Sequence, residues 1–326
     1  MKSKPAKKEQ TSLFNIMEQV QITNKIMRPK DATFDGKTVE LNGKSPISTS
    51  TTAVMEPPKD NQPTKNTAKT DEKALDAIYS NLIKGVKNYF AHNRFKRGVV
   101  GLSGGVDSAL VLKIAVDALG AENVTAMMMP ELGLTRQDNI DHSKILCQFF
   151  GVSCFYQPIN SFVMDFAIVP WKPTSVAQMN TKARTRMVLL YNYANTENAL
   201  VLGTSNKSEL LLGYGTKFGD MAADIEVIGD LFKTEVVKLA NHAGLPPEIA
   251  NKAPSAELSP GQTDEEDIGA NYQDLDKVLT KLELGRNGCI ERGLPAALVS
   301  LVFRRVEENK HKTTLPFTVV AHQASS

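Results

Sequence analysis

A phosphate-binding loop is indicated by the stretch VVGLSGGVDSALVLKIA, which begins at residue 99. An apolar run meets two glycines, two serines and an acid, and then continues in a helical pattern. Glycines let a backbone approach an anion closely, and the amides that open the next helix face that anion. The residues expected to surround the phosphates are Gly101, Leu102, Ser103, Gly104, Gly105, Val106, Asp107 and Ser108.

This loop carries Asp107 near the place where a Walker loop has its lysine. That lysine neutralises the β- and γ-phosphates during phosphoryl transfer. A carboxylate beside phosphates is repulsive unless a cation lies between them, and Mg²⁺ binds one or two carboxylates together with phosphate oxygens. The sequence therefore predicts that Asp107 is a magnesium ligand. It also predicts that the departing group is pyrophosphate, so that ATP is cut between its α- and β-phosphates.

The elements that must position this loop begin where the composition changes, near Asp71. Residues 1–70 are rich in Lys, Thr, Ser, Pro, Asn and Gln, and we expect a polar, largely disordered extension there. Within it, a helical face over residues 13–20 and an Asp-Gly hairpin in TFDGKTVEL are weaker expectations of order.

From Asp71 onward, continuously apolar strands alternate with helices, which predicts a parallel sheet covered on both faces. The expected fold class is therefore a doubly wound α/β domain over residues 71–317, followed by a short tail over 318–326. Ligands bind beyond the carboxyl ends of such strands, and Leu102 is one of these ends. The expected helices are about 72–91, 106–120, 136–150, 180–195, 272–284 and 294–309, and the expected strands are 98–102, 124–129, 152–159 and 199–204.

The composition and net charge of the chain exclude several classes of protein. The chain has 326 residues, 41% hydrophobic and 23% charged, with a net charge of only +2, so no nucleic-acid partner is expected. The 3 cysteines read as reduced thiols, and the 5 histidines form no zinc motif. No secretory signal or membrane anchor is recognisable. We expect a cytoplasmic protein without a membrane partner.

The hexapeptide SGGVDS resembles the loop of the N-type ATP pyrophosphatases, which have the adenine nucleotide α-hydrolase-like fold. Members of that superfamily adenylate a carboxylate or carbonyl oxygen, and nitrogen or sulfur then displaces AMP. The loop alone does not choose among GMP synthetase, asparagine synthetase, tRNA-thiolating enzymes and NAD synthetase.

Five later motifs resemble NAD synthetase and occur in that family's order between about Lys73 and Phe317. They are NTKARTRMVLLYNYA, LGTSNKSE, GYGTKFGDMAADIEVIGDLFKTEV, APSAELSPGQTDEEDIG and NKHKTTLPF. The resemblance implies that ATP adenylates the nicotinate carboxylate of deamido-NAD, and that ammonia then displaces AMP to give NAD⁺. It also implies a homodimer with deamido-NAD at the seam, near the helix that carries Arg184 to Tyr193.

The resemblance also implies roles for single residues. Thr204 and Lys233 correspond to ATP contacts, and Lys233 would stabilise charge on the departing phosphates. Glu209 corresponds to a second metal ligand, and two carboxylates with a polyphosphate form an ordinary magnesium shell. Asp220 is the candidate for holding ammonium or taking its proton, because the attacking nitrogen must be neutral.

The residues that correspond to deamido-NAD contacts are Arg184, Tyr191, Lys217, Asp224, His311 and Lys312. Arg184 and Arg186 diverge by about 200° on a helix and cannot face one ligand equally. Arg186 is thus left with a role in the fold, an interface or ATP binding. For Tyr191, ordinary helix packing is an equal alternative to stacking near the nicotinate.

Three positions depart from the family's usual pattern. Ser255 keeps the hydroxyl expected to contact ATP, Glu257 is longer than the usual aspartate, and Thr313 stands where an arginine often follows. The residues before the domain are too few for a glutamine-hydrolysing amidase domain. Free ammonia is therefore the expected donor, with a separate glutaminase as an alternative. Another amidating or thiolating ATP pyrophosphatase and a nucleotide sensor without turnover are the competing hypotheses.

Overall fold

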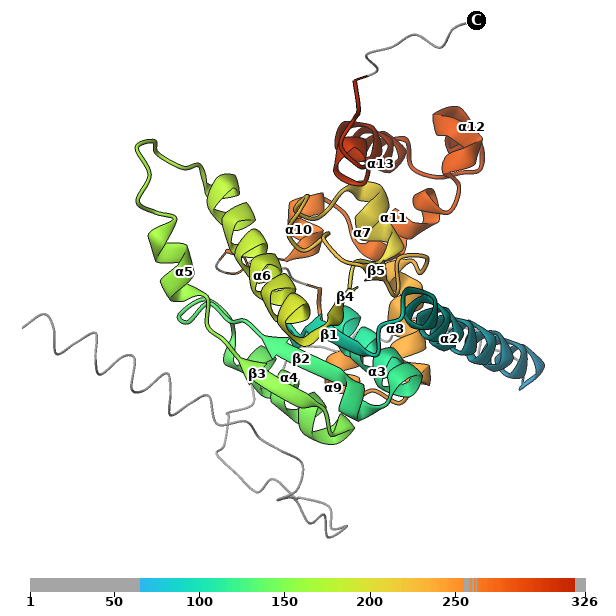
Figure 1. The fold of residues 1–326 in the computed structure, drawn as a ribbon. Coiled ribbons are helices and arrows are strands. Elements are labelled where there is room, and N and C mark those ends of the chain that lie inside the picture. The colour runs from blue at the N-terminus through green and yellow to red at the C-terminus, as the bar shows by residue number, and fades with distance from the viewer. Residues whose placement is uncertain (1–64, 255–257, 260, 262, 320–326) are drawn as a thin grey trace, which may run out of the picture.

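The computed structural model describes residues 65–319, except 255–257, 260 and 262 (Figure 1). The short helix and hairpin expected near the N-terminus therefore lie outside the described residues, as do Ser255 and Glu257. The expected extension and tail lie mostly outside them too.

The centre of the fold is a five-stranded sheet with the strand order β3-β2-β1-β4-β5. Every pairing is parallel, which confirms the predicted α/β class. The four predicted strands are present, and a fifth, β5, has only two residues and escaped the sequence pattern. The bounds are β1 Arg97–Gly101, β2 Val124–Met128, β3 Ser153–Tyr156, β4 Ala199–Gly203 and β5 Ile225–Glu226.

The six predicted helices are present as α2, α3, α4, α6, α11 and α13, with differences at their ends, while the described residues also contain six helices that were not predicted. Together, their bounds are α2 Lys65–Asn93, α3 Val106–Leu119, α4 Gln137–Phe150, α5 Asn160–Asp165, α6 Ser175–Glu197, α7 Lys207–Leu212, α8 Lys233–His242, α9 Pro247–Ala250, α10 Asp264–Ile268, α11 Tyr272–Leu279, α12 Gly285–Glu291 and α13 Ala296–Asn309. Short 3₁₀ turns lie at Ala121–Asn123, Leu282–Leu284 and Lys310–Lys312.

Three helix ends depart from the sequence prediction. Helix α2 begins at Lys65, about seven residues early, because the polar stretch KNTAKT carries no apolar periodicity to mark a helix. Helix α6 begins at Ser175, where Thr174 accepts a hydrogen bond from the Ala177 amide as an N-cap. The predicted helix over 272–284 ends at Leu279, where the Thr280 hydroxyl donates to the backbone carbonyl of Lys277.

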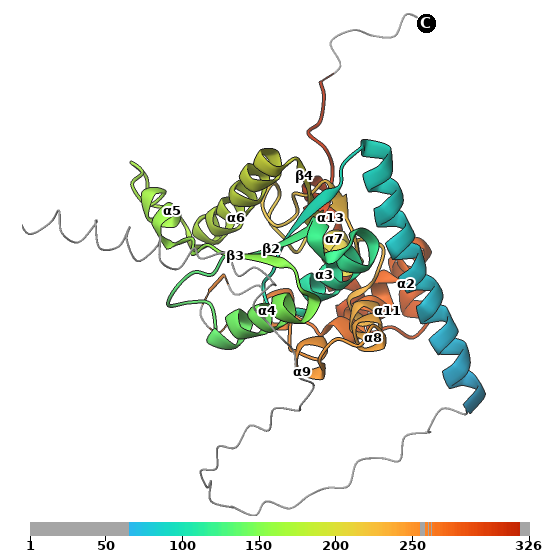
Figure 2. The ribbon, with the colours of Figure 1, turned by 60° about the horizontal axis from the view of Figure 1, so that its bottom comes forward.

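Helices cover both faces of the sheet (Figures 1 and 2). Helices α2, α3, α4, α8 and α9 share one apolar core with the strands, in which Val100 and Leu110 are fully buried. Helix α6 covers the opposite face, where Val99 and Val201 are buried. The strands are apolar on both faces because both are covered.

The C-terminal helices build a second body of apolar side chains beside the sheet. Helices α7, α11, α12 and α13 bury Leu212, Leu275, Cys289 and Val299 together. This packing fixes α7, and α7 carries Glu209. Among the described residues, no helix has both the length and the apolar character needed to cross a membrane.

Candidate active site

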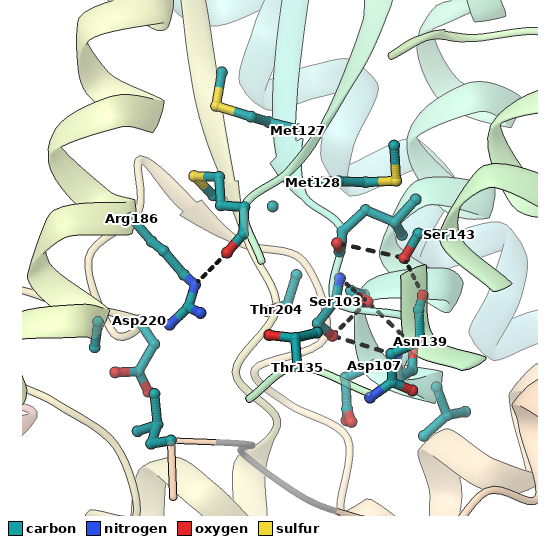
Figure 3. Close-up of a pocket in the computed structure, with 18 of the residues that line it drawn as sticks. Ser103, Asp107, Met127, Met128, Thr135, Asn139, Ser143, Arg186, Thr204 and Asp220 are labelled. Atoms are coloured by element: carbon teal, nitrogen blue, oxygen red, sulfur yellow. Dashed lines mark hydrogen bonds between the residues drawn. The ribbon is translucent and has the colours of Figure 1, made fainter. Parts of the chain in front are cut away.

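A cavity of about 310 Å³ lies beyond the carboxyl ends of β1, β2 and β4 (Figure 3). This is the location predicted for a ligand of a doubly wound sheet. The predicted residues that line it are Gly101, Leu102, Ser103, Gly105, Val106, Asp107, Ser108, Thr204, Glu209, Asp220 and Lys233. The structure thus brings the predicted ATP, metal and ammonium residues into one place, apart from Gly104 and the undescribed Ser255.

Gly104 belongs to the same loop but faces α4. Its φ is +80°, a conformation that favours glycine, and a Cβ there would collide with the backbone of Asn139. The side chains of Ser103 and Ser108 stabilise the loop through hydrogen bonds to its own backbone. The Ser108 hydroxyl donates to the Gly105 carbonyl at 3.1 Å, and the Gly105 amide donates to Ser103 Oγ at 3.3 Å.

Three charged side chains meet at the floor of the cavity. Lys233 Nζ lies 2.5 Å from Asp107 Oδ2 and 3.3 Å from Glu209 Oε1, and the Lys233 side chain is only 4% exposed. Burial opposes the charge of Lys233, but Asp107 and Glu209 outweigh this effect and raise its pKa above the usual range. Burial raises the pKa of Glu209 despite the neighbouring Lys233, and Asp107 raises it further.

Asn206 is a site residue that the sequence reasoning missed. Its amide Nδ2 donates to Asp107 Oδ1 at 2.9 Å, and its Oδ1 accepts from the Glu209 backbone amide at 3.0 Å. Asn206 is fully buried and is the N-cap of α7, with Glu209 completing a capping box. The signal in the sequence was the SNKSE pattern, an N-cap residue followed three residues later by Glu.

Asp264, Tyr214 and Tyr272 were also missed. Asp264 is 4% exposed and lines the cavity, and burial raises its pKa. The hydroxyls of Tyr214 and Tyr272 lie 3.1 Å and 3.4 Å from its two carboxylate oxygens. The Tyr272 ring lies 5.3 Å from Lys233 Nζ, close enough for a cation–π contact. In the sequence Asp264 stands in the acidic run TDEED, which reads as an ordinary helix start.

The carboxylates Asp107 and Glu209 suit a divalent ion that also binds phosphate. Both are already arranged around one cation, the ammonium of Lys233. Among the described residues, no three His, Cys, Asp or Glu side chains are grouped to hold a metal ion by themselves. This donor set fits Mg²⁺, which typically takes only one or two carboxylates and completes its shell with phosphate oxygens and water.

Asp220 and Arg186 face the cavity from its other side (Figure 3). Asp220 Oδ1 accepts from the Thr216 amide at 2.9 Å. Burial by the surrounding protein raises the pKa of Asp220, although the residue keeps exposed surface and lines the cavity. Arg186 Nε donates to the Met129 carbonyl at 2.9 Å. Of the roles left open for Arg186, its place in the wall favours the nucleotide.

Four of the residues expected to bind deamido-NAD lie together outside this cavity. The Arg184 guanidinium donates to the Lys217 carbonyl at 3.2 Å, and Lys217 Nζ donates to the His311 carbonyl at 2.6 Å. Lys312 Nζ donates to the Gly213 carbonyl at 2.8 Å. The chain's own carbonyls thus engage these cations, and the segment around His311 is fastened to the loop before Asp220.

The other two, Tyr191 and Asp224, line a separate cavity of about 220 Å³. Asp224 Oδ2 accepts from the Val201 amide at 2.7 Å, so this carboxylate also binds the backbone of β4. Burial raises the pKa of Tyr191 to about 12, and Asp224 contributes to the same shift. The six expected deamido-NAD residues therefore form two groups.

The parallel sheet, the glycine loop and the nucleotide-sized cavity beyond its strands define an adenine nucleotide α-hydrolase-like protein. The family model of NAD synthase matches residues 78–316, and the chain belongs to that family. It is 40% identical over 243 residues to the NH(3)-dependent NAD(+) synthetase of Wolinella succinogenes, covering 74% of this chain and 94% of that one. It is 40% identical over 252 residues to the enzyme of the same name from Methanocaldococcus jannaschii, covering 75% and 97%.

Solved structures are also similar in fold, among them two synthetases. One is the NMN synthetase from Francisella tularensis, with a TM-score of 0.68 and 30% identity, covering 75% of this chain and 98% of that one. The other is the NH3-dependent NAD synthetase from Campylobacter jejuni in complex with nitrate, with a TM-score of 0.66 and 32% identity, covering 76% and 99%.

Proposed function

We propose that the chain is an ammonia-dependent NAD⁺ synthetase. ATP adenylates the nicotinate carboxylate of deamido-NAD with release of pyrophosphate, and ammonia displaces AMP to give NAD⁺. One observation carries the proposal: the glycine loop, two carboxylates and a buried lysine converge in a cavity beyond the strand ends. The names of the relatives support NAD⁺ as the product and ammonia as the nitrogen donor.

The residues on the cavity floor would carry out the first half-reaction, the adenylation of the carboxylate by ATP. The loop amides from Gly104 to Asp107 and the dipole of α3 would bind the phosphates. Asp107 and Glu209 would hold Mg²⁺, which neutralises the departing pyrophosphate. Lys233, which is paired with Asp107, would add a positive charge close to the departing phosphates. Thr204 would meet the nucleotide, and Ser255 is a proposed ATP contact outside the described residues.

A residue on the opposite wall of the cavity would assist the second half-reaction, the displacement of AMP by ammonia. Asp220 would hold ammonium and take its proton, since only neutral ammonia attacks the adenylate. Burial raises the pKa of Asp220, which makes its carboxylate a stronger base toward ammonium than an exposed aspartate. Arg184, Lys217, His311, Lys312, Tyr191 and Asp224 remain the proposed deamido-NAD contacts.

We also propose a homodimer. Large apolar side chains are exposed in α5, in the segment that follows it and at the start of α6: Phe162, Met164, Phe166, Ile168, Trp171 and Val176. The exposed fraction reaches 85% at Ile168. A patch of this kind usually marks an interface. Light scattering would detect the dimer, and Ile168→Asp should convert it to a monomer. A monomeric wild type would contradict this part of the proposal. The cytoplasmic location stays a prediction.

The test of the function is a product assay. Purified protein with ATP, Mg²⁺, deamido-NAD and ammonium should yield NAD⁺, AMP and pyrophosphate, resolved by chromatography and ³¹P NMR. ADP and phosphate as products would refute the proposal. Nicotinate mononucleotide should be offered in a parallel reaction, since one similar structure is an NMN synthetase. Glutamine in place of ammonium should give no product without a separate glutaminase.

A substitution at Asp107 tests whether the products are formed at this cavity. Asp107→Asn keeps the size of the side chain but removes the charge that faces Lys233. It should abolish pyrophosphate release while its circular dichroism spectrum stays unchanged. Full activity would show that Asp107 does not hold the metal.

A further inference from the structure

Glu226 is a partly buried carboxyl next to the cavity that the reaction above does not use. It lies in β5, the two-residue edge strand, where it pairs with Gly203 of β4. Beyond Gly203 the chain leaves the sheet and turns toward α7. The Ser205 amide in this turn donates to Glu226 Oε2 at 3.2 Å. The carboxylate thus replaces the backbone acceptor that a longer β5 would have supplied.

Gly203 makes room for this carboxylate. A Cβ at position 203 would collide with the Glu226 carboxylate and would also press on Ala223. Burial raises the pKa of Glu226 to about 7, and Asp220 adds to the shift, while the Ser205 amide opposes it. Ionised or neutral, the carboxyl keeps an acceptor oxygen for that amide.

The turn held by Glu226 carries residues of the site. Thr204 lines the cavity directly. Asn206 follows, and its side chain donates to Asp107 at 2.9 Å. A chain of hydrogen bonds and backbone therefore runs from Glu226 in the edge strand through Ser205 and Asn206 to the Asp107 carboxylate on the cavity floor. Glu226 does not line the cavity, so it acts on the ligand only through this turn.

We propose that Glu226 is a positioning residue of the ATP site, which fixes the turn after β4 so that Thr204 faces the nucleotide and Asn206 holds the Asp107 carboxylate. The proposal rests on the proposed function only in taking ATP as the ligand. It assigns to β5 a role in the geometry of the phosphate site rather than in the sheet alone.

The experiment compares Glu226→Leu, which has no acceptor, with Glu226→Gln, which keeps one. Binding of α,β-methylene-ATP with Mg²⁺ is measured by calorimetry, and NAD⁺ formation gives KM and kcat. In Glu226→Leu the Kd and the KM for ATP should rise about tenfold, as expected for the loss of one buried hydrogen bond. Glu226→Gln should stay within about threefold of the wild type, because its amide oxygen accepts from Ser205.

The control is Thr174→Val, which removes a side-chain acceptor from a backbone amide at the start of α6. It should lower the melting temperature without changing the Kd, which separates positioning from general stability. If Glu226→Leu does not fold, Glu226→Met takes its place. If neither variant folds, the Kd of Glu226→Gln for the ATP analogue decides. A Kd raised tenfold overturns the proposal, and a Kd close to that of the wild type supports it.

Wild-type nucleotide affinity in Glu226→Leu would overturn the proposal, as would equal losses in the Leu and Gln variants. The binding measurement needs no turnover. A wild type that binds the analogue but makes no NAD⁺ would therefore refute the proposed function while leaving the role of Glu226 open to the same comparison.

Discussion

Asn206→Ala should be far more destabilising than the loss of an ordinary helix cap. Asn206 is fully buried and makes two kinds of contact, a cap to the Glu209 amide and a hydrogen bond to the Asp107 carboxylate. Losing the cap costs about 1 kcal/mol of unfolding free energy. Losing a hydrogen bond to a charged group costs about 1.5–3 kcal/mol more. The total is about 2.5–4 kcal/mol.

The chain offers a matched control in Asn271. This residue is the N-cap of α11 and accepts from the Asp274 amide at 2.9 Å. It also donates to the Asp274 carboxylate at 3.0 Å, but this hydrogen bond is exposed to water and adds little, and Asn271 touches no cavity carboxylate. Asn271→Ala should cost only about 1 kcal/mol. The two variants should therefore differ by about 1.5–3 kcal/mol, or roughly 3–12 °C in melting temperature for a domain of this size.

The assay is urea unfolding followed by circular dichroism, with ATP-analogue binding measured on the same preparations. Asn206→Asp is the third variant, because it keeps the cap but sets a second carboxylate against Asp107. It should bind the analogue with Mg²⁺ at least about tenfold more weakly than the wild type, since one like-charge contact replaces one hydrogen bond. Equal losses of stability in Asn206→Ala and Asn271→Ala would refute the reasoning.

Three further outcomes are expected. Lys233→Met should lower kcat for pyrophosphate release by about 10²–10³, measured by a coupled pyrophosphate assay, because it removes a fixed charge at the departing phosphates; a change of KM alone would contradict this role. Gly104→Ala should lose nucleotide binding in a calorimetric titration, since it collides with Asn139 and strains a φ of +80°; wild-type binding would contradict the close packing. Native Glu226 holds its proton up to about pH 7, whereas the unfolded chain releases it near 4.5, so its contribution to stability falls as the pH rises through this window. Urea titrations at pH 5 and pH 8 should show Glu226→Gln gaining up to about 3 kcal/mol relative to the wild type at the higher pH, and no relative gain would contradict the burial of the carboxyl.

The sheet and the loop could be predicted because their signals are local. Apolar runs mark the strands, and the loop residues stand within eight positions of one another. Asp107, Glu209 and Lys233 were predicted from separate motifs, and the structure brings them together although Asp107 and Lys233 are 126 positions apart. That convergence follows from the parallel sheet, whose strand ends all meet at one edge.

The missed residues lack such a signal. Asp264 joins the cavity only because α10 folds back against it, and its sequence context is that of an exposed helix start. Strand β5 has only two residues, which is too few to show the alternation of apolar and polar residues that marks a strand. The pairing of Glu226 with Gly203 could therefore not be predicted from the sequence. Arg186 was separated from Arg184 by the helical repeat, but which of them faces the nucleotide depends on how α6 lies on the sheet.

The capping box of α7 makes the site inseparable from the folding of one short helix. Asn206 and Glu209 exchange hydrogen bonds between side chain and backbone, at 3.2 Å and 3.0 Å, and these two residues also reach Asp107 and Lys233. A six-residue helix has little stability of its own and depends on its packing against α11 and α13. A chain with an unformed α7 therefore has no carboxylate pair. Nucleotide binding should in turn protect the amides of α7 from hydrogen exchange, because ligand binding to the folded state disfavours local opening.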